Sequence, residues 1–348
     1  MAYELSKRFQ EHHEVRIAVY KDHIDPEWES ELDIYKLRCK GLLALRELRR
    51  LINEFKPDII HSHDWLGLLV ANKNIPHVAT THSHWPSDWF YSPKAFAAGL
   101  IQGIPNEIKL HFVDQVIAVS EYDRQLIHRR GIQSYVIYNG VDSQFFERIS
   151  GEMPFLKNPS IISVGGIDKR KADYLLPLIK LLINKNPKIA FYIIGSPQDR
   201  QIVAKLINIE NACYLGIVED VRPYLQKADV FISTSKMELF GLAAVEAQAS
   251  GLPVVAFDIC SFPEIIKNGK SGFLIDYGNL EEMCKKILEI INNKSLKEEM
   301  SINAVENAKR FLWDYASQEY LGLFSSIIFI VSGAQRVTNT PSFRSRMK

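Results

Sequence analysis

Short, nearly continuous runs of apolar residues recur along the chain, and segments with helical periodicity separate them. Runs without alternating polarity are typical of strands that are covered on both faces, and such strands form parallel sheets in layered α/β proteins. The runs of the first half begin at Glu14, Pro57, Pro76, Asp114 and Ser134. Those of the second half begin at Ser160, Ile189, Asn211, Ala228, Leu252 and Ser271. The pattern predicts an α/β protein with two series of parallel strands.

The two series are separated by a segment that lacks a sustained period and contains Gly151, Pro154 and Pro159. Such a composition indicates a linker. A chain of 348 residues also exceeds the size at which a single hydrophobic core usually stops growing. We therefore predict a first domain over residues 1–150, a linker over residues 151–159 and a second domain over residues 160–310.

The start of the chain departs from this order. Ala2, Leu5 and Phe9 form a helical stripe ahead of the first predicted strand, whereas a helix that covers a parallel sheet normally crosses over from a preceding strand. We expect this helix to cover a sheet position that the chain itself does not fill. The strand that begins at Glu14 should then have an open edge or lie in a rearranged sheet.

The composition is that of an ordinary globular protein, with 47% hydrophobic and 24% charged residues. A formal net charge of +1 gives no reason to expect nucleic acid as a partner. The four cysteines form no CxxC pair, so a zinc site and a disulfide framework are not indicated and a reducing compartment fits best. The most apolar stretch, Leu321 to Val331, is about half as long as a membrane-spanning helix, and the first residues do not resemble a signal peptide. These features predict a cytoplasmic protein.

The strongest local signal is the segment ELFGLAAVE from Glu238 to Glu246, which directly follows a predicted strand. A strand end, a glycine and a helix start form a corner that binds anions, because the amides of the first helical turn are unpaired and the helix dipole is positive there. The two glutamates are about two helical turns apart, so we expect both carboxylates along one side of the helix. Taken alone, two glutamates on one helix face are also compatible with a solvated surface.

A longer segment around this corner resembles the C-terminal signature of glycosyltransferase family 4. In that family two glutamates, separated by seven residues, belong to a run that begins E-x-F-G and continues as E-A-x-A-x-G-x-P-V. A P-E pair and a later glycine follow this run. The matching residues are Glu238, Phe240, Gly241, Glu246, Ala247, Ala249, Gly251, Pro253, Val254, Pro263, Glu264 and Gly272.

Other segments are similar to the same family, and the resemblance covers about residues 1–327. SVGGIDKRKADYLL, from Ser163, resembles the segment that carries the phosphate-contacting lysine of the family, which is Lys171 here. The remaining segments are YNGVD from Tyr138, VSEYDRQLI from Val119, TTHSH from Thr80 and a closing helix over residues 311–327 that crosses back to the first domain.

The resemblance implies the GT-B fold, in which two Rossmann-like domains face each other across a cleft. It also implies a retaining, metal-independent transfer of a hexose from a nucleotide-diphosphate sugar to a sugar, polysaccharide or lipid-linked acceptor. The nucleotide sugar is a co-substrate, and no cofactor is expected. The alternatives are a truncated, catalytically dead homologue that only binds nucleotide and, more distantly, a nucleotide-sugar isomerase on the same architecture.

The resemblance assigns roles to single residues. Lys171, Glu238 and His82 are expected at the reaction centre, where Lys171 would meet the negative charge that develops on the leaving nucleoside diphosphate. Glu246 is expected to accept hydrogen bonds from the ribose hydroxyls, for which the two oxygens of a carboxylate are suited. The other expected donor-binding residues are Arg170, Gly165, Phe240, Gly241 and Leu242, and the expected acceptor-side residues are His63, Asp64 and His84, beside His61.

Each assignment has a plainer alternative. Without its motif, the cluster Lys169–Lys171 is compatible with a solvated loop. A lone histidine after a strand, such as His82, is compatible with a structural role. The histidine-rich set is also compatible with a zinc site, but the sequence lacks cysteines at the spacing of a zinc finger.

Three features differ from the family pattern. Gly166 stands where the family has an arginine, so one phosphate contact is missing unless Arg170 supplies it. Ala172 replaces the glycine that follows the lysine. The first strand of the family and its glycine-rich loop would precede Ala2.

Residues 328–348 match neither the family nor a packed element, and we predict a disordered tail there. The tail contains the basic residues Arg336, Arg344, Arg346 and Lys348. As an alternative, these charges attract an anionic membrane surface, which would associate the protein peripherally with the inner face of the membrane.

Overall fold

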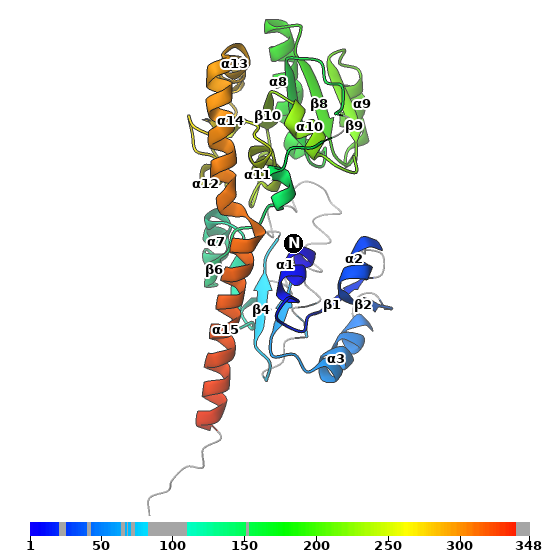
Figure 1. Cartoon of the computed structure of the whole chain (residues 1–348), viewed down its shortest axis with the longest axis vertical. Coiled ribbons are helices and arrows are strands. Elements are labelled where there is room, and N and C mark those ends of the chain that lie inside the picture. Colours follow the sequence, from blue (N-terminus) through cyan, green and yellow to red (C-terminus); the bar gives the residue numbers. More distant parts are fainter. Residues whose placement is uncertain are drawn as a thin grey trace, which may run out of the picture. The chain divides into compact units, whose positions relative to one another are not determined.

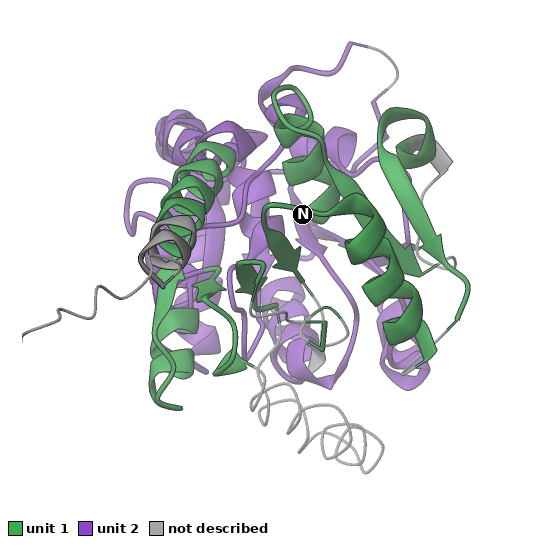
Figure 2. Cartoon of the chain, turned by 90° about the horizontal axis from the view of Figure 1, so that it is seen from below, with its two compact units in different colours: residues 1–119, 123–137, 316–348 green, residues 120–122, 138–315 purple. Residues whose placement is uncertain are grey.

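The computed structural model of the chain describes residues 1–20, 26–39, 43–63, 67, 69–70, 74–82, 110–150 and 153–338 (Figure 1). The chain divides into two compact units (Figure 2). Unit 1 contains residues 1–119, 123–137 and 316–348, and unit 2 contains residues 120–122 and 138–315. Both units are built on parallel strands, as the apolar runs predicted.

Unit 2 contains a six-stranded parallel sheet with the order β12-β11-β10-β7-β8-β9. Its strands are β7 (Ser160–Val164), β8 (Ala190–Ile194), β9 (Ala212–Gly216), β10 (Val230–Ser233), β11 (Val254–Phe257) and β12 (Gly272–Ile275). Each strand lies within one of the apolar runs predicted for the second half of the chain. The strand order reverses between β7 and β10, and ligands of open parallel sheets bind outside the carboxyl ends of the strands at such a point.

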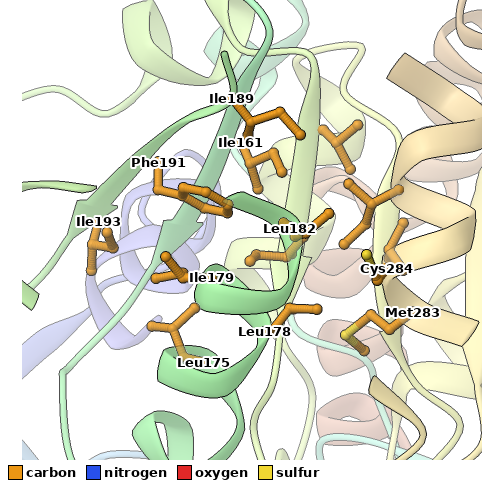
Figure 3. Packing of buried hydrophobic residues seen from close by; sticks show 14 of the residues in the cluster. Ile161, Leu175, Leu178, Ile179, Leu182, Ile189, Phe191, Ile193, Met283 and Cys284 are labelled. Atoms are coloured by element: carbon orange, nitrogen blue, oxygen red, sulfur yellow. The ribbon is translucent and has the colours of Figure 1, made fainter. Parts of the chain in front are cut away.

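Apolar side chains join the helices of unit 2 to this sheet. The helices are α8 (Lys169–Lys185), α9 (Arg200–Ile207), α10 (Arg222–Lys227), α11 (Leu242–Ala249), α12 (Phe262–Ile265), α13 (Leu280–Asn292) and α14 (Lys294–Ala308). The buried residues of α8 meet those of the strands and of α13 in one cluster that includes Leu175, Leu178, Ile179, Leu182, Ile161, Phe191, Ile193, Met283 and Cys284 (Figure 3). Cys284 is thus a core residue, and all four cysteines are free thiols.

The described residues of unit 1 form two sheets. A four-stranded parallel sheet comprises, in this order, β3 (Ile60–Ser62), β4 (His77–Thr80), β5 (Gln115–Ala118) and β6 (Ser134–Val136). A two-stranded parallel sheet comprises β1 (Arg16–Tyr20) and β2 (Asp33–Leu37). Among the described strands, β1 pairs with β2 alone, and Arg16 and Ala18 are exposed. The expectation of an open edge on the first strand stays a prediction.

The sequence pattern does not predict β2. Asp33 and Lys36 interrupt the apolar residues of this strand, and within it only Leu37 is buried. A search for continuous apolar runs passes over such a strand. Leu37 packs with Ala44 and Leu48 of α3 (Ala44–Phe55), which anchors the small sheet.

Helix α1 (Ala2–Phe9) buries part of the predicted stripe, since Leu5 is 1% exposed and Phe9 is 7% exposed. The ring of Phe9 contacts that of Phe324 in the final helix, with centroids 5.8 Å apart. Tyr3 stacks on Trp28 of α2 (Pro26–Glu31) at 4.8 Å. Helix α1 therefore links the final helix to α2 within unit 1.

The final helix, α15 (Trp313–Thr338), differs from the prediction at both ends. Residues 309–311 form the short 3-10 helix η6, and the α-helix continues beyond the expected end at Ile327. No proline occurs between Trp313 and Pro341, so nothing in this stretch removes a helical hydrogen bond. Residues 313–315 belong to unit 2 and those from Ala316 onward belong to unit 1, so the helix passes from the second unit to the first. None of the helices in the described part of the chain combines the length and apolar character needed to cross a membrane.

Candidate active site

The first part of the site lies where β7 ends and α8 begins. Asp168 caps α8 by accepting hydrogen bonds from the main-chain N–H groups of Arg170 (2.9 Å) and Lys171 (3.3 Å). The Lys171 ammonium donates to the carbonyl oxygen of Val164 at 3.1 Å. Gly165, with a φ of +128°, leaves room for this ammonium, because a Cβ atom there would lie 2.2 Å from Lys171 Nζ. The fold thus brings together two residues of the predicted site, Gly165 and Lys171.

The space beside Gly166 holds a side chain that the sequence did not single out. A Cβ atom at Gly166 would lie 2.5 Å from Nε2 of Gln198. The amide of Gln198 therefore occupies room that a larger residue at position 166 would need. Arg170, expected to replace the missing arginine, donates through Nε to Asp168 Oδ2 at 2.7 Å. Its guanidinium is thus paired with the carboxylate that caps the helix.

The second part of the site follows β10. Ser235 Oγ donates to Oε1 of Glu238 at 3.0 Å, and the same oxygen lies 4.0 Å from Nζ of Lys171. Thr234 Oγ1 donates to the carbonyl oxygen of Lys171 at 3.0 Å. The segments after β7 and β10 are therefore tied together at the reversal of strand order, where a ligand site is expected. The side chains of Lys171 and Glu238 are only 17% and 28% exposed, so solvent screens their attraction less than it would at the surface.

Gly241 determines how the chain enters α11. It precedes the helix in a left-handed conformation, with a φ of +85°. Glu238 consequently lies in the loop before the helix, and the expectation that both glutamates follow one helix face was wrong. Phe240 is 3% exposed and packs on Phe311, with centroids 5.5 Å apart. Its ring is a core element, whereas the side chain of Leu242, the first helical residue, is 39% exposed.

Glu246 lies inside α11 and has no hydrogen-bond or ion-pair partner among the described residues. Burial raises the pKa of its carboxyl group to about 7. A partly buried carboxyl group without a partner is costly for the folded chain. This cost is typical of groups whose partner is a ligand.

Three histidines gather at the ends of β3 and β4 in unit 1. Nδ1 of His63 and Nε2 of His82 are 3.0 Å apart, so one ring donates to the other. The rings of His61 and His63 are in contact, with centroids 4.2 Å apart. The fold therefore joins two predicted site residues, His63 and His82. The predicted residues Asp64 and His84 lie outside the described part of the chain.

The histidine cluster is held neutral and tied to the final helix. Nε2 of His61 lies 2.7 Å from Thr80 Oγ1, which lies 3.1 Å from the hydroxyl of Tyr320. Burial lowers the pKa of His61 to about 3 and that of His82 to about 4, and it lowers the pKa of His63 well below its usual range. His82 nevertheless keeps accessible surface at the edge of the cluster. Within the described ranges, no group of three or more His, Cys, Asp or Glu side chains is arranged to hold a metal ion.

We expect the free energy of unfolding to fall when the pH is lowered from 7.5 to 5. Burial lowers the pKa of His61 to about 3 and that of His77 to about 4, whereas histidines of an unfolded chain titrate near pH ~6.5. Below that pH the unfolded chain binds protons that the folded chain does not, which at pH 5 is worth up to about 2 kcal/mol per histidine. Melting temperatures at the two pH values measure the effect.

The variant His77→Gln provides the comparison. His77 is 1% exposed and lies 2.9 Å from Ser62 Oγ through Nε2, a contact that the amide of glutamine can replace. The variant should show a weaker dependence of melting temperature on pH than the wild type. An equal pH dependence of the melting temperature in the wild type and in His77→Gln would show that His77 does not resist protonation in the fold.

Unit 2 has a pocket of about 690 Å³ on its surface, and none of the predicted site residues lines it. It is lined by Asp142, by residues of the 3-10 helix η5 (Ser143–Phe146), by residues 218–222 and by Tyr224. The volume of a pocket is weaker evidence for an active site than the charged groups that lie around Lys171. We therefore assign the candidate active site by its charged groups and by its position at the reversal of strand order.

Two family models match the chain in succession. The model for Glycosyltransferase Family 4 matches residues 1–145, and the model for Glycosyl transferases group 1 matches residues 146–309. An uncharacterized glycosyltransferase of Haemophilus influenzae is 26% identical over 279 residues, which cover 77% of this chain and 76% of that protein. The sulfoquinovosyl transferase of Arabidopsis thaliana is 28% identical over 305 residues, which cover 79% of this chain and 58% of that protein.

The crystal structure of Anabaena HepE in complex with UDP and glucose shares the fold, with a TM-score of 0.75 over 93% of this chain and 95% of that one, at 19% identity. This likeness, together with the parallel α/β units, defines the GT-B class and confirms the predicted fold. The two family models together account for residues 1–309. The chain therefore belongs to glycosyltransferase family 4, as the motifs around Lys171 and Glu238 indicated.

Proposed function

We propose that this glycosyltransferase moves a hexose from a nucleoside-diphosphate sugar to a sugar, polysaccharide or lipid-linked acceptor, with retention of configuration and without a metal ion. The observation that carries the proposal is the approach of Lys171 Nζ to Glu238 Oε1, 4.0 Å apart, at the reversal of strand order in unit 2. A cation and a carboxylate at this place suit the two ends of a sugar nucleotide, one anionic and the other rich in hydroxyl groups.

Lys171 is proposed to stabilise the leaving group. When the bond between the sugar and the diphosphate breaks, negative charge grows on the diphosphate oxygen. The hydrogen bond to Val164 holds the ammonium in place before the reaction, so little reorganisation is needed as the charge develops. Its contribution therefore falls mainly on the transition state and less on the bound substrate.

Glu246 is proposed to bind the ribose. A carboxylate has two oxygens that accept hydrogen bonds from two neighbouring hydroxyl groups. The carboxyl group has no partner among the described residues and a pKa raised to about 7 by burial, so bound hydroxyl donors would favour its ionised form. This supports a role in binding the nucleotide rather than in the bond-breaking step.

His82 is proposed to contact the reacting sugar. Sugar transfer passes through a transition state with positive charge on the ring. A neutral imidazole can bind a sugar hydroxyl without repelling that charge, and burial lowers the pKa of His82 to about 4. The hydrogen bond with His63 fixes the orientation of the ring.

A catalytically dead homologue that only binds nucleotide is the second candidate. The observation that favours it is the loss of the arginine of the family at Gly166, where the amide of Gln198 occupies the adjoining space. Because Arg170 is paired with Asp168, a replacement phosphate contact from this residue would first require that pair to open.

The test combines binding and turnover. The full-length chain is titrated with UDP-, GDP- and ADP-sugars in a calorimeter, beginning with UDP-glucose because the HepE structure holds UDP and glucose. We expect one nucleotide to bind and its sugar to be released or transferred with the anomeric configuration retained, at a rate that EDTA does not change. Binding without any turnover would support the dead homologue, and a lack of binding to every nucleotide would contradict both candidates.

A further inference from the structure

Three buried serine hydroxyls surround the loop that carries Glu238. Ser235 is 1% exposed and donates to Oε1 of Glu238 at 3.0 Å. Ser261 is completely buried and donates to the main-chain carbonyl oxygen of Glu238 at 3.1 Å. Ser120, also completely buried, donates to the carbonyl oxygen of Leu239 at 2.5 Å. The carboxylate and two successive carbonyl groups of the loop are therefore all held by hydroxyl groups.

Ser120 comes from a distant part of the sequence and is itself held in place. Residues 120–122 belong to unit 2, where the Glu264 carboxylate accepts hydrogen bonds from the N–H groups of Glu121 and Tyr122, both at 2.8 Å. The hydroxyl of Tyr138 donates to the same carboxylate at 3.1 Å. Because two main-chain amides bind one carboxylate, the position of Ser120 relative to Glu264 is well defined.

Ser261 and Glu264 share one short element of structure. Ser261 immediately precedes α12, and Glu264 lies within this helix. A Cβ atom on Gly241 would lie 3.0 Å from Cδ1 of Ile265, so the loop also packs tightly on α12. The loop that carries Glu238 is thus fixed by α12 directly through Ser261 and indirectly through Glu264 and Ser120.

Loss of either hydroxyl would leave a buried carbonyl group without a donor. Such a group costs more than the hydrogen bond itself is worth, because it has given up its contact with water. The main chain would be expected to turn the carbonyl toward water. The carboxylate of Glu238 would then move away from Lys171, which lies 4.0 Å from it.

We propose that Ser120 and Ser261 are positioning residues that hold the main chain of Glu238 and Leu239, so that the Glu238 carboxylate remains beside the Lys171 ammonium. This inference rests on the proposed function, which assigns Glu238 to the sugar part of the donor. The nucleotide part is assigned to Glu246 and Lys171, whereas the two serines donate to the main chain of Glu238 and Leu239. Their loss should therefore affect recognition of the sugar much more than recognition of the nucleotide.

The binding experiment compares UDP-glucose with UDP in the wild type and in the variants Ser120→Ala and Ser261→Ala. In each variant the preference for UDP-glucose over UDP should decrease about tenfold, and kcat should fall by a similar factor, while the affinity for UDP changes little. Ser261→Thr, which keeps the hydroxyl, should retain most of the preference. An unchanged preference in both alanine variants would overturn the proposal and leave the proposed function intact.

Two other serines of unit 2 provide matched controls. Ser271 is completely buried, and its Oγ accepts a hydrogen bond from the N–H of Lys267 at 3.0 Å. Ser271→Ala should lower the melting temperature without changing the preference for UDP-glucose. The hydroxyl of Ser250 is buried without a partner among the described residues, so Ser250→Ala should leave the preference unchanged without lowering the melting temperature. A loss of preference in Ser271→Ala equal to that in Ser261→Ala would indicate general destabilisation and overturn the proposal.

If neither UDP nor UDP-glucose binds, either the protein uses another donor or the proposed function fails. A measurement on the unliganded protein still tests the positioning role of the two serines in that case. Hydrogen–deuterium exchange reports on the amides of residues 238–241 in the unliganded protein. Exchange in this segment should become faster in Ser120→Ala and Ser261→Ala and remain at the wild-type rate in Ser271→Ala. Wild-type exchange rates in the first two variants would show that the serines do not hold the loop.

Discussion

Replacing Lys171 with alanine is expected to lower kcat for sugar transfer by about 100-fold or more. The ammonium donates to Val164 and faces the carboxylate of Glu238, so it is held ready for charge that appears only when the donor bond breaks. Binding of the free nucleoside diphosphate should weaken much less than turnover falls. Steady-state kinetics with the preferred donor, combined with calorimetry of the nucleoside diphosphate, measure the two effects separately.

Lys169 provides the matched control for this variant. It lies in the first turn of the same helix but is exposed. Lys169→Ala removes the same charge from the same helix end and should leave kcat within about threefold of the wild type, because exposed charges contribute little. Unchanged turnover in Lys171→Ala would remove this residue from the mechanism.

A large effect on stability is expected at Gly195, which follows β8. A Cβ atom on Gly195 would lie 2.1 Å from the carbonyl oxygen of Gly165, and the φ of +146° is itself unfavourable for other residues. Gly195→Ala should lower the free energy of unfolding by about 3 kcal/mol or more, since the clash is with main chain that cannot move freely. Urea denaturation measures this loss. Because Gly165 borders Lys171, binding of the donor should weaken as well.

A variant at Gly216 measures the cost of the backbone conformation without a steric clash. The φ of Gly216 is +70°, but a Cβ atom there would meet no atom within 4 Å. Gly216→Ala should therefore cost only the roughly 1–2 kcal/mol of a left-handed alanine. Equal losses in the two variants would show that the contact between Gly195 and Gly165 is not the dominant effect.

The predictions from sequence succeeded where one physical signal decided the outcome. Every strand of unit 2 lies within a run of apolar residues. The central strands are covered on both faces, so few polar positions interrupt their runs. The motifs placed Lys171 and Glu238 in one expected site, and their charged groups lie 4.0 Å apart, while their roles stay a prediction. β2, which has a single buried position, carries no comparable signal.

The remaining features depend on contacts between distant segments. Phe240 belongs to the family motif, but only the packing against Phe311 shows that its ring is a core element. The side chain of Gln198 lies beside Gly166 because the segments that carry them follow β8 and β7, which are neighbours in the sheet. The separation of Glu238 from α11 depends on the left-handed backbone of Gly241. None of these contacts has a signature in local periodicity.

The discontinuous chain of unit 1 has a consequence for its synthesis. Thr80 and Tyr320, whose hydroxyl oxygens lie 3.1 Å apart, are separated by 240 positions in the sequence. At roughly 5–20 residues per second, a ribosome needs about 12–48 s to make the intervening chain. During this time Phe9 lacks the ring of Phe324 on which it packs, whereas residues 138–315 of unit 2 follow one another without interruption. Unit 1, which begins to leave the ribosome first, therefore keeps this apolar surface uncovered until the final helix has been made.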